Sequence, residues 1–228
     1  MACTQRKVQL GHRARLETAL RALVGAVFAL ALAVGAGRAD AFTATLNPAS
    51  PLTVYLQVGV GSFTGDYIFG GQPQNNTTIN TEAVTVSSSA VGNGTAQAMT
   101  TNSTQTQSFW DGFTFCSVPG QLYIGGFYRT TGATTAAAQV TATVPAFLTD
   151  TDGDKLPFSK ISWTSSGNGD TGAEPFPAAS FTGGGIQNVG SMSSNTWNES
   201  CWSFSYLNNT VTAAGTYTGV VLYTLSAP

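Results

Sequence analysis

Leu52-Thr53-Val54-Tyr55-Leu56-Gln57-Val58-Gly59-Val60 is the segment that decides the fold class. Its even-numbered residues are all leucine or valine, so an apolar side chain recurs at every second position. A period of two is typical of a β-strand that buries one face. We therefore predict a strand here, with the even-numbered side chains against a core and the odd-numbered ones toward solvent.

Three further segments extend this pattern. Residues 81–86 and 139–144 repeat the alternation, and Pro145 closes the second because proline cannot continue a ladder. Residues 216–225 place one apolar set on one face, namely Tyr217, Val221, Tyr223 and Leu225. Val220 and Leu222 make the opposite face apolar too, so we expect a well-covered strand near the centre of a sheet.

Turn-forming residues separate these segments. They are Gly70-Gly71, Gly92-Asn93-Gly94, Asp152-Gly153, Gly167-Asn168-Gly169 and Gly183-Gly184-Gly185. No window after residue 42 has a sustained helical period. Short strands joined by glycine-rich turns predict an all-β protein, an antiparallel β-sandwich of immunoglobulin-like or jelly-roll-like topology. Disorder is the alternative for so polar a chain, but 42% hydrophobic residues are enough for a core.

The N-terminal segment reads as a secretory signal peptide. Its positively charged first part, the n-region, contains Arg6, Lys7, Arg13, Arg15 and Arg21. An apolar run from Ala22 to Ala36 follows, and then Ala39-Asp40-Ala41. The run is shorter than the roughly 20 residues that span a bilayer, which disfavours the alternative of a retained anchor. We predict cleavage after Ala41, a leader at residues 1–41 and one sandwich domain at residues 42–228.

Loss of the leader would leave a chain with few cations. Residues 42–228 keep three, Arg129, Lys155 and Lys160, against nine carboxylates, a formal net charge of −6. So few cations cannot neutralise a run of phosphates, which argues against nucleic acids, anionic membranes and acidic ligands as partners. No later stretch is long or apolar enough to predict a transmembrane anchor in the mature chain.

The sequence offers no recognisable catalytic constellation. The only histidine, His12, lies in the predicted leader, so the mature chain has no Ser-His-Asp or Cys-His arrangement and no histidine metal site. A carboxylate pair could still hydrolyse a glycoside. The candidates are Asp66, Glu82, Asp111, Asp170, Glu174 and Glu199, and their spacing selects no two of them. We predict a protein that is not an enzyme and has no cofactor, calcium being the one alternative.

Two cysteines remain after the leader, since Cys3 would be removed with it. In an exported chain Cys116 and Cys201 are expected to form a disulfide, with two free buried thiols as the alternative. Closing a loop of that length stabilises the fold by on the order of 4 to 5 kcal/mol in the entropy model.

The neighbours of the cysteines suggest a register. Aromatic residues alternate with Cys116 at Phe109, Phe113 and Phe115, and with Cys201 at Trp202, Phe204 and Tyr206. If the two segments are neighbouring strands, the bridge lies on a face of small residues and the aromatic residues form core on the other face. A bridge through the core is the alternative, and it would turn the aromatic residues outward.

Two further patterns predict ligand sites. Asp150, Asp152 and Asp154 flank Gly153 and resemble the start of a calcium loop, although Ile161 stands where such a loop needs its bidentate acid. The alternative is a solvated turn. Trp110, Trp163 and Trp197 stand beside polar or turn residues and could stack on sugars, with a core role as the alternative. Trp202 is assigned to the core.

The end of the chain resembles a known family. Gly215-Thr216-Tyr217-Thr218-Gly219-Val220-Val221-Leu222-Tyr223-Thr224 and the early Phe42-Thr43-Ala44-Thr45-Leu46 resemble terminal strands of pilin-like sandwiches secreted by bacteria. The resemblance implies a small exported protein with one disulfide and a C-terminal strand read by a periplasmic chaperone. The chain differs in its tail, residues 225–228, and in lacking an early mature cysteine. As a whole it is similar to uncharacterised secreted β-sandwich proteins of Gram-negative bacteria.

The sequence therefore predicts a secreted or cell-surface structural or interaction protein, pilin-like or adhesin-like, without catalytic activity. It would be periplasmic, at the cell surface or extracellular. Its partner would be another protein or further copies of itself, with a carbohydrate-binding module as the alternative. The two differ observably, because an interaction subunit should show an unpaired apolar strand edge and a glycan binder should show exposed coplanar tryptophans.

Overall fold

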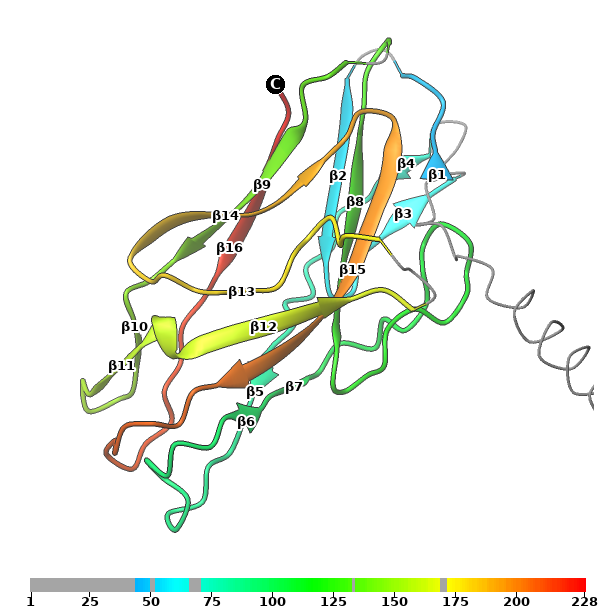
Figure 1. Cartoon of the computed structure of the whole chain (residues 1–228). Helices are drawn as coiled ribbons and strands as arrows, with labels where there is room; N and C mark the ends of the chain where they lie inside the picture. The colour runs from blue at the N-terminus through cyan, green and yellow to red at the C-terminus, as the bar shows by residue number, and fades with distance from the viewer. Residues whose placement is uncertain (1–43, 50–51, 66–70, 133, 169–171) are drawn as a thin grey trace, which may run out of the picture. The chain divides into compact units, whose positions relative to one another are not determined.

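The protein is built from short antiparallel strands (Figure 1). The computed structural model describes residues 44–49, 52–65, 71–132, 134–168 and 172–228, so the predicted leader lies outside the described residues. The strands are β1 (Ala44–Thr45), β2 (Thr53–Val58), β3 (Phe63–Thr64), β4 (Gln72–Pro73), β5 (Glu82–Ala83), β6 (Gln97–Ala98), β7 (Thr100–Thr101), β8 (Leu122–Arg129), β9 (Ala138–Val144), β10 (Phe147–Thr149), β11 (Lys155–Pro157), β12 (Ile161–Ser166), β13 (Ala179–Ser180), β14 (Gly185–Met192), β15 (Thr196–Tyr206) and β16 (Leu222–Ser226). In the described ranges the one helical element is the 3-10 turn η1 (Phe158–Lys160), which confirms the all-β prediction. Within these same ranges, no helix is long and apolar enough to cross a membrane.

The largest sheet is organised around β15. Its strand order is β13-β12-β15-β8-β2, and β1 and β6 also pair with β15. β15 pairs with β12 from Cys201 to Tyr206 and with β8 from Asn198 to Trp202, so the two neighbours lie on opposite edges of it. β15 and β8 are therefore the central strands of this sheet.

Strand β8 is buried on both faces, and all eight of its residues are buried. Leu122 and Ile124 point to one side of the sheet, while Tyr123 and Phe127 point to the other. This strand could not be predicted from alternation in the sequence, because a strand covered on both sides has no apolar-polar alternation. Gly125 and Gly126 also interrupt the β-branched pattern on which strand recognition depends.

A three-stranded sheet, in the order β14-β9-β16, supplies the other half of the core. The alternation predicted for residues 139–144 is confirmed in β9, where Val140, Ala142 and Val144 are buried. The chain passes from β14 into β15 of the larger sheet through residues 193–195. Asn195 adopts a positive φ of 56° there, which asparagine tolerates better than most residues, and its side chain accepts a hydrogen bond from the Thr130 amide at 3.0 Å.

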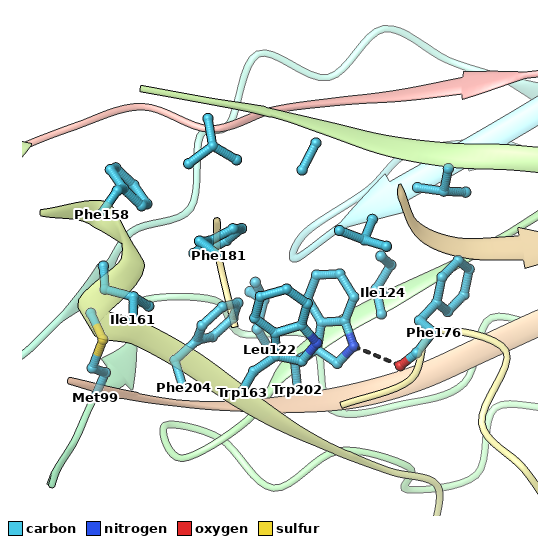
Figure 2. Packing of buried hydrophobic residues seen from close by; sticks show 14 of the residues in the cluster. Met99, Leu122, Ile124, Phe158, Ile161, Trp163, Phe176, Phe181, Trp202 and Phe204 are labelled. Atoms are coloured by element: carbon cyan, nitrogen blue, oxygen red, sulfur yellow. Dashed lines mark hydrogen bonds between the residues drawn. The ribbon is translucent and has the colours of Figure 1, made fainter. Parts of the chain in front are cut away.

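The main core lies between these two sheets, and its phenylalanine and tryptophan residues are shown in Figure 2. The stripe predicted at Trp202, Phe204 and Tyr206 is confirmed as core. The Trp202 indole nitrogen donates a hydrogen bond to the carbonyl oxygen of Phe176 at 2.9 Å, so its one polar group is satisfied in an apolar setting. The ring centroid of Trp202 lies 5.1 Å from that of Trp163.

The opposite face of the larger sheet is also covered, which corrects the expectation for β2. Leu56 and Val58 pack against the main core, as predicted. However, Tyr55 and Gln57, which were expected to face solvent, are more buried than Leu56 and Val58. Tyr55 belongs to a second group of buried apolar residues, the outer cluster, which consists of Ala44, Leu46, Tyr55, Phe127 and Trp197. Gln57 is buried beside it and accepts a hydrogen bond from the Tyr55 hydroxyl.

Two other strand predictions need correction. Residues 81–86 keep their alternation, but only Glu82 and Ala83 form a ladder, the two-residue strand β5. The segment 216–225 was expected to be central, and it instead contributes β16 to the edge of the three-stranded sheet. Its inner residues Tyr223 and Leu225 do pack on the core, but Leu222 on the other face has no covering layer and is exposed.

We predict that Gly126→Ala destabilises the fold because a Cβ at this position would overlap the backbone carbonyl oxygen of Tyr55 on β2. Overpacking of this kind costs about 1–3 kcal/mol in the free energy of unfolding, measured by urea denaturation. The matched control is Gly185→Ala at the start of β14, where a Cβ meets nothing within 4 Å. Equal stability of the two variants would contradict the described packing of β8 against β2.

Candidate functional site

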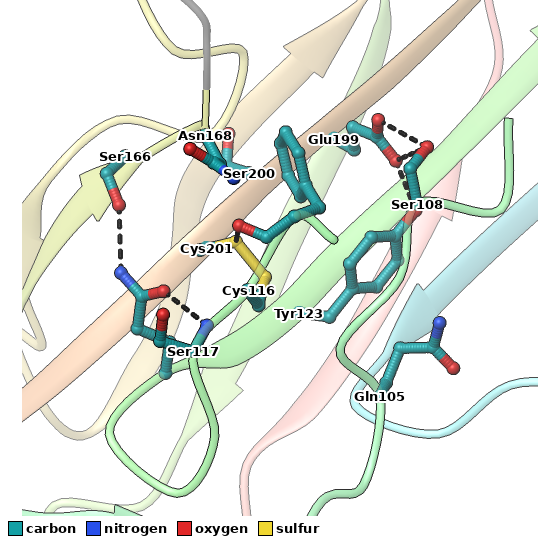
Figure 3. Close-up of a disulfide and its surroundings, with 12 residues drawn as sticks. Gln105, Ser108, Cys116, Ser117, Tyr123, Ser166, Asn168, Glu199, Ser200 and Cys201 are labelled. Carbon is teal, nitrogen blue, oxygen red and sulfur yellow. Dashed lines mark hydrogen bonds between the residues drawn. A yellow bond between two sulfur atoms is a disulfide. The ribbon is translucent and has the colours of Figure 1, made fainter. Parts of the chain in front are cut away.

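A long loop between β7 and β8 crosses the outer face of the larger sheet and is fixed to it by a disulfide (Figure 3). Cys116 of the loop bonds to Cys201 of β15, with their Cα atoms 5.6 Å apart, which confirms the predicted pairing. Cys116 lies in no strand, so the expected pairing of two neighbouring strands is wrong. The strand neighbours of Cys201 are Tyr123 and Ser166.

The bridge lies away from the main core. Together with Phe115 and Tyr123 the two cysteines form a small buried group, the disulfide cluster. Trp202, the residue after Cys201, belongs to the main core on the other face. The alternative of a bridge through the main core is therefore wrong, and the disulfide ties the loop to the outer face of the sheet.

A second anchor of the loop is the carboxylate of Glu199 on β15. Ser108 Oγ of the loop donates to both oxygens of this carboxylate, at 2.7 and 3.0 Å. Tyr123 Oη donates to Oε2 at 2.6 Å and Trp197 Nε1 donates to the same oxygen at 2.9 Å. Because all three partners are donors, both oxygens of the carboxylate receive charge-assisted hydrogen bonds from side chains.

The register of the central strands explains how Tyr123 reaches Glu199. Gly125 of β8 lies directly opposite Glu199 of β15, and Gln57 of β2 lies opposite Gly125 on its other side. A Cβ on Gly125 would come within 2.5 Å of the Tyr123 hydroxyl, so the absence of a side chain there lets the tyrosine ring lie along the strand. On β2 the Tyr55 hydroxyl donates to Gln57 Oε1 at 2.7 Å, so this row of the face is polar as well as buried.

Burial dominates the electrostatics of this group. It raises the pKa of Glu199, and the hydrogen bonds from Tyr123, Trp197 and Ser108 oppose that rise. Burial raises the pKa of Tyr123 well above its ordinary value, and the nearby Glu199 charge adds to the effect. Tyr123 thus remains a neutral donor, and the group serves to hold Ser108, and with it the loop, on the sheet.

Between the two anchors the loop turns tightly. Gln107 and Thr114 form an isolated antiparallel bridge, and the Ser108 amide donates to the Phe113 carbonyl oxygen at 2.8 Å. The Gly112 amide donates back to Ser108 at 3.0 Å, and Gly112 takes a positive φ of 77° that favours glycine. Asn168 Nδ2, from the segment after β12, donates to the Thr114 carbonyl oxygen at 2.8 Å. These contacts give the turn one defined shape.

The turn carries exposed aromatic surface. We call residues 110–113 the aromatic tip. Phe113 is 75% exposed, so the prediction that it forms core is wrong. The alternation argument fails there because residues 109–113 form a turn and not a strand. Trp110 is half-buried against the outer cluster, and Asp111 between the two aromatic residues is exposed.

The tryptophans do not form the predicted sugar-stacking platform. Trp163 is 3% exposed and packs in the main core, and Trp197 is 6% exposed in the outer cluster. Both are wrong as stacking candidates, because neither offers a ring face to solvent. Polar or turn residues beside a tryptophan in the sequence do not mean that the tryptophan is exposed. Here each indole is covered by residues from other parts of the chain. Trp110 is the candidate that keeps accessible surface.

The acidic run between β10 and β11 forms a turn. Asp150 Oδ1 accepts hydrogen bonds from the backbone amides of Asp152 at 3.1 Å and Asp154 at 2.8 Å. Gly153 has a positive φ of 90°, as the turn alternative predicts. In the described residues no three acidic, cysteine or histidine side chains gather as metal ligands, so the proposed calcium ligands are not brought together.

Most of the candidate carboxylates are dispersed, but Asp111 on the aromatic tip is near enough to Glu199 for its charge to raise the pKa of Glu199. Asp66 and Asp170 lie outside the described residues. Glu199 points to the outer face of β15, whereas Glu174 accepts a hydrogen bond from Ser200 Oγ, the next residue on that strand, at 2.8 Å. Glu82 lies on β5, opposite Thr101 of β7. The three are held by different neighbours, and Glu199 has both oxygens occupied by protein donors.

Glu82 stands apart because one of its carboxylate oxygens, Oε1, is buried and has no hydrogen-bond partner in the described part of the chain. Burial raises the pKa of Glu82 to about 7, and a hydrogen bond with Thr101 works against that rise. Its charge in turn raises the pKa of Tyr223 on β16, although burial is the larger cause there. Glu82 is therefore mostly neutral in the fold when the pH is below about 7.

We predict that the free energy of unfolding falls as pH rises from about 4.5 to about 7. The Glu82 pKa is about 7 in the fold against an ordinary 4.5, so its contribution is complete below about 4.5 and is lost as pH rises through about 7. Glu82→Gln should flatten this pH dependence in urea titrations and be the more stable protein at pH 8. Asp152→Asn, which alters an exposed carboxylate, is the control. An unchanged slope in Glu82→Gln would refute the assignment.

Comparisons with protein-family models, with curated proteins and with solved structures gave no match to this chain.

Proposed function

We propose that this protein is a non-catalytic interaction protein of the cell envelope or exterior, and that it binds a protein partner through the aromatic tip. The observation that carries the proposal is Phe113, a large apolar side chain held 75% exposed on an anchored turn. A folded chain gains nothing by leaving such a group in water. Aromatic side chains are, however, the preferred anchors of protein interfaces.

The anchoring of the tip supports this function. Binding residues are concentrated on loops that a rigid scaffold positions, and a side chain fixed beforehand loses less entropy on binding. Here the scaffold supplies the disulfide at Cys116 on one side of the turn and the Ser108–Glu199 hydrogen bonds on the other. Trp110 would supply a second, half-buried aromatic contact next to Phe113.

The disulfide and the net charge also support this proposed function. A disulfide persists in oxidising compartments, which supports an exported protein at the periplasm, cell surface or exterior. With Arg129, Lys155 and Lys160 as the cations of residues 42–228, nucleic acids and anionic membranes are poor partners. The proposed finer description of the fold is a β-sandwich of immunoglobulin-like or jelly-roll-like type, consistent with two sheets that share one core.

A second candidate function is carbohydrate binding at the same tip. It is favoured by the partly exposed ring of Trp110 beside the exposed carboxylate of Asp111, since sugars take both an apolar stacking surface and a hydrogen-bond acceptor. The other tryptophans Trp163, Trp197 and Trp202 are buried, so a change in tryptophan fluorescence with a polysaccharide would report on Trp110.

The test is site-specific photo-crosslinking in the native host, with benzoylphenylalanine at position 113 and, as the control, at Val211. Val211 is also an exposed apolar residue, 80% accessible, but it lies outside the loop. We expect a discrete adduct with one protein from position 113 and none from position 211. The same adducts from both positions, or none from either, would contradict protein binding at the tip.

Variants then separate binding from folding. Phe113→Ala should abolish capture by a photo-crosslinker placed at Asp111, while its free energy of unfolding stays within about 0.5 kcal/mol of the parent, as for most exposed positions. If no adduct forms but polysaccharide changes the fluorescence of the parent and not of Trp110→Phe, the carbohydrate candidate replaces the protein partner.

A further inference from the structure

We infer that β16 is a self-association edge, through which two copies of this chain join their three-stranded sheets by antiparallel pairing of β16 with β16. This inference concerns a part of the fold separate from the aromatic tip and does not depend on the function proposed there. Four observations carry it: the position of β16, the lack of protection at its edge, its exposed apolar residues and its self-complementary sequence.

β16 is the terminal strand in the order β14-β9-β16. It pairs with β9 at every residue from Leu222 to Ser226. No described strand forms a ladder with its other edge, and β2, the edge strand of the larger sheet, lies close to it without pairing. Shortly before the strand, Thr218 exchanges two backbone hydrogen bonds of 2.9 Å with Thr149, which fixes the approach of the chain. A strand held on one side leaves the backbone donors and acceptors of its other side directed outward, and this is a template for a further strand.

The two edges of this sheet differ in their protection. β14 has a register shift between Asn188 and Gly190, and such a bulge disrupts edge-to-edge pairing. Gln187 on β14 also spans to the neighbouring segment, accepting from the Thr182 amide at 2.9 Å and donating to the Ser180 carbonyl oxygen at 2.8 Å. β16 has no bulge, no proline and no charged residue. An edge with none of these devices is suited to pairing.

Apolar side chains are exposed at the same edge. Leu222 is 64% exposed and Val220, just before the strand, is 74% exposed. Tyr223 and Leu225 on the other face already pack on the main core, so the strand is held in place without Leu222. Pairing of two such edges would place each Leu222 beside Ser226 of the second copy and cover part of its exposed surface.

The sequence of β16 suits a two-fold partner. With the axis at Thr224, the antiparallel register places Thr224 opposite Thr224, Tyr223 opposite Leu225 and Leu222 opposite Ser226. Threonine–threonine cross-strand pairs are favourable. This register keeps the two cores on the same face of the joined sheet, which a shift by one residue would not do.

Charge also favours a second copy as the occupant. Residues 207–228 contain no Asp, Glu, Lys or Arg, so the edge offers no ionic group to select a charged partner. The net charge of −6 on residues 42–228 is carried outside this segment, so two copies can pair without juxtaposing like charges at the seam. Added salt should screen the repulsion between copies and strengthen association.

The test is the native mass of the purified protein across a range of concentrations, by light scattering and sedimentation velocity. We expect a monomer–dimer equilibrium that salt does not weaken. Leu222→Lys should weaken it roughly tenfold or more, because charge at a strand edge opposes pairing. Val211→Lys, at an 80% exposed valine outside the strand, should leave it unchanged. A monomer at all concentrations, or equal effects of the two lysines, would overturn the inference.

Cysteine crosslinking tests the register directly, in a Cys3→Ser background. Thr224→Cys should link two copies under mild oxidation. Thr143→Cys should not, because Thr143 is exposed on β9, the central strand of the same sheet. Linking by both or by neither would refute the register. A ladder of larger oligomers would also refute it, because a two-fold interface closes at two copies. Phe113→Ala should dimerise normally. An experiment that rules out partner binding at the aromatic tip therefore does not rule out dimerisation through β16, and the reverse also holds.

Discussion

Burial of strand β8 on both faces is the constraint on which the rest of the structure depends. One face is covered by the three-stranded sheet, as in any two-layer β protein. The other face, with Tyr123 and Phe127, needs a second cover. The long loop between β7 and β8 provides most of it, and Phe63 of β3 packs against Phe127 with their ring centroids 5.8 Å apart. The aromatic tip is part of this covering loop. The need to cover the outer face of β8 therefore also explains where the tip lies.

A loop that covers a sheet buries polar groups together with apolar ones. In this fold the buried donors of Ser108, Tyr123 and Trp197 are hydrogen-bonded to the carboxylate of Glu199. A buried carboxylate without partners is strongly unfavourable, whereas three side-chain donors around Glu199 offset part of its desolvation. The same hydrogen bonds fix Ser108, and the disulfide fixes Cys116 a few residues later. The turn between these two anchors is therefore held without any core contact at Phe113, whose side chain remains available for a partner.

Alternation predicted β9 and the inward stripe of β15, because each of those strands buries one face in the main core. It failed for β8, which has no polar face to alternate with, and for Tyr55 and Gln57, whose solvent side is covered by segments distant in sequence. The disulfide followed from the cysteine count and compartment. Its place on the outer face did not, because Cys116 lies in a loop where a period of two has no meaning. The Glu199 group could not be foreseen either, since it joins the loop, β8 and β15 through a register that no local pattern encodes.

The central claim is that the loop is a structural layer of the fold and not a mobile connection. Hydrogen exchange followed by mass spectrometry tests it most directly. The account predicts slowest exchange in peptides from β8 and β15, and protection of the Ser108, Gly112, Phe115 and Cys116 amides, which are hydrogen-bonded within the loop. That protection should be lost together with that of β8 as denaturant is raised. Exchange of residues 106–116 at the rate of an unstructured peptide, with β8 still protected, would contradict the account.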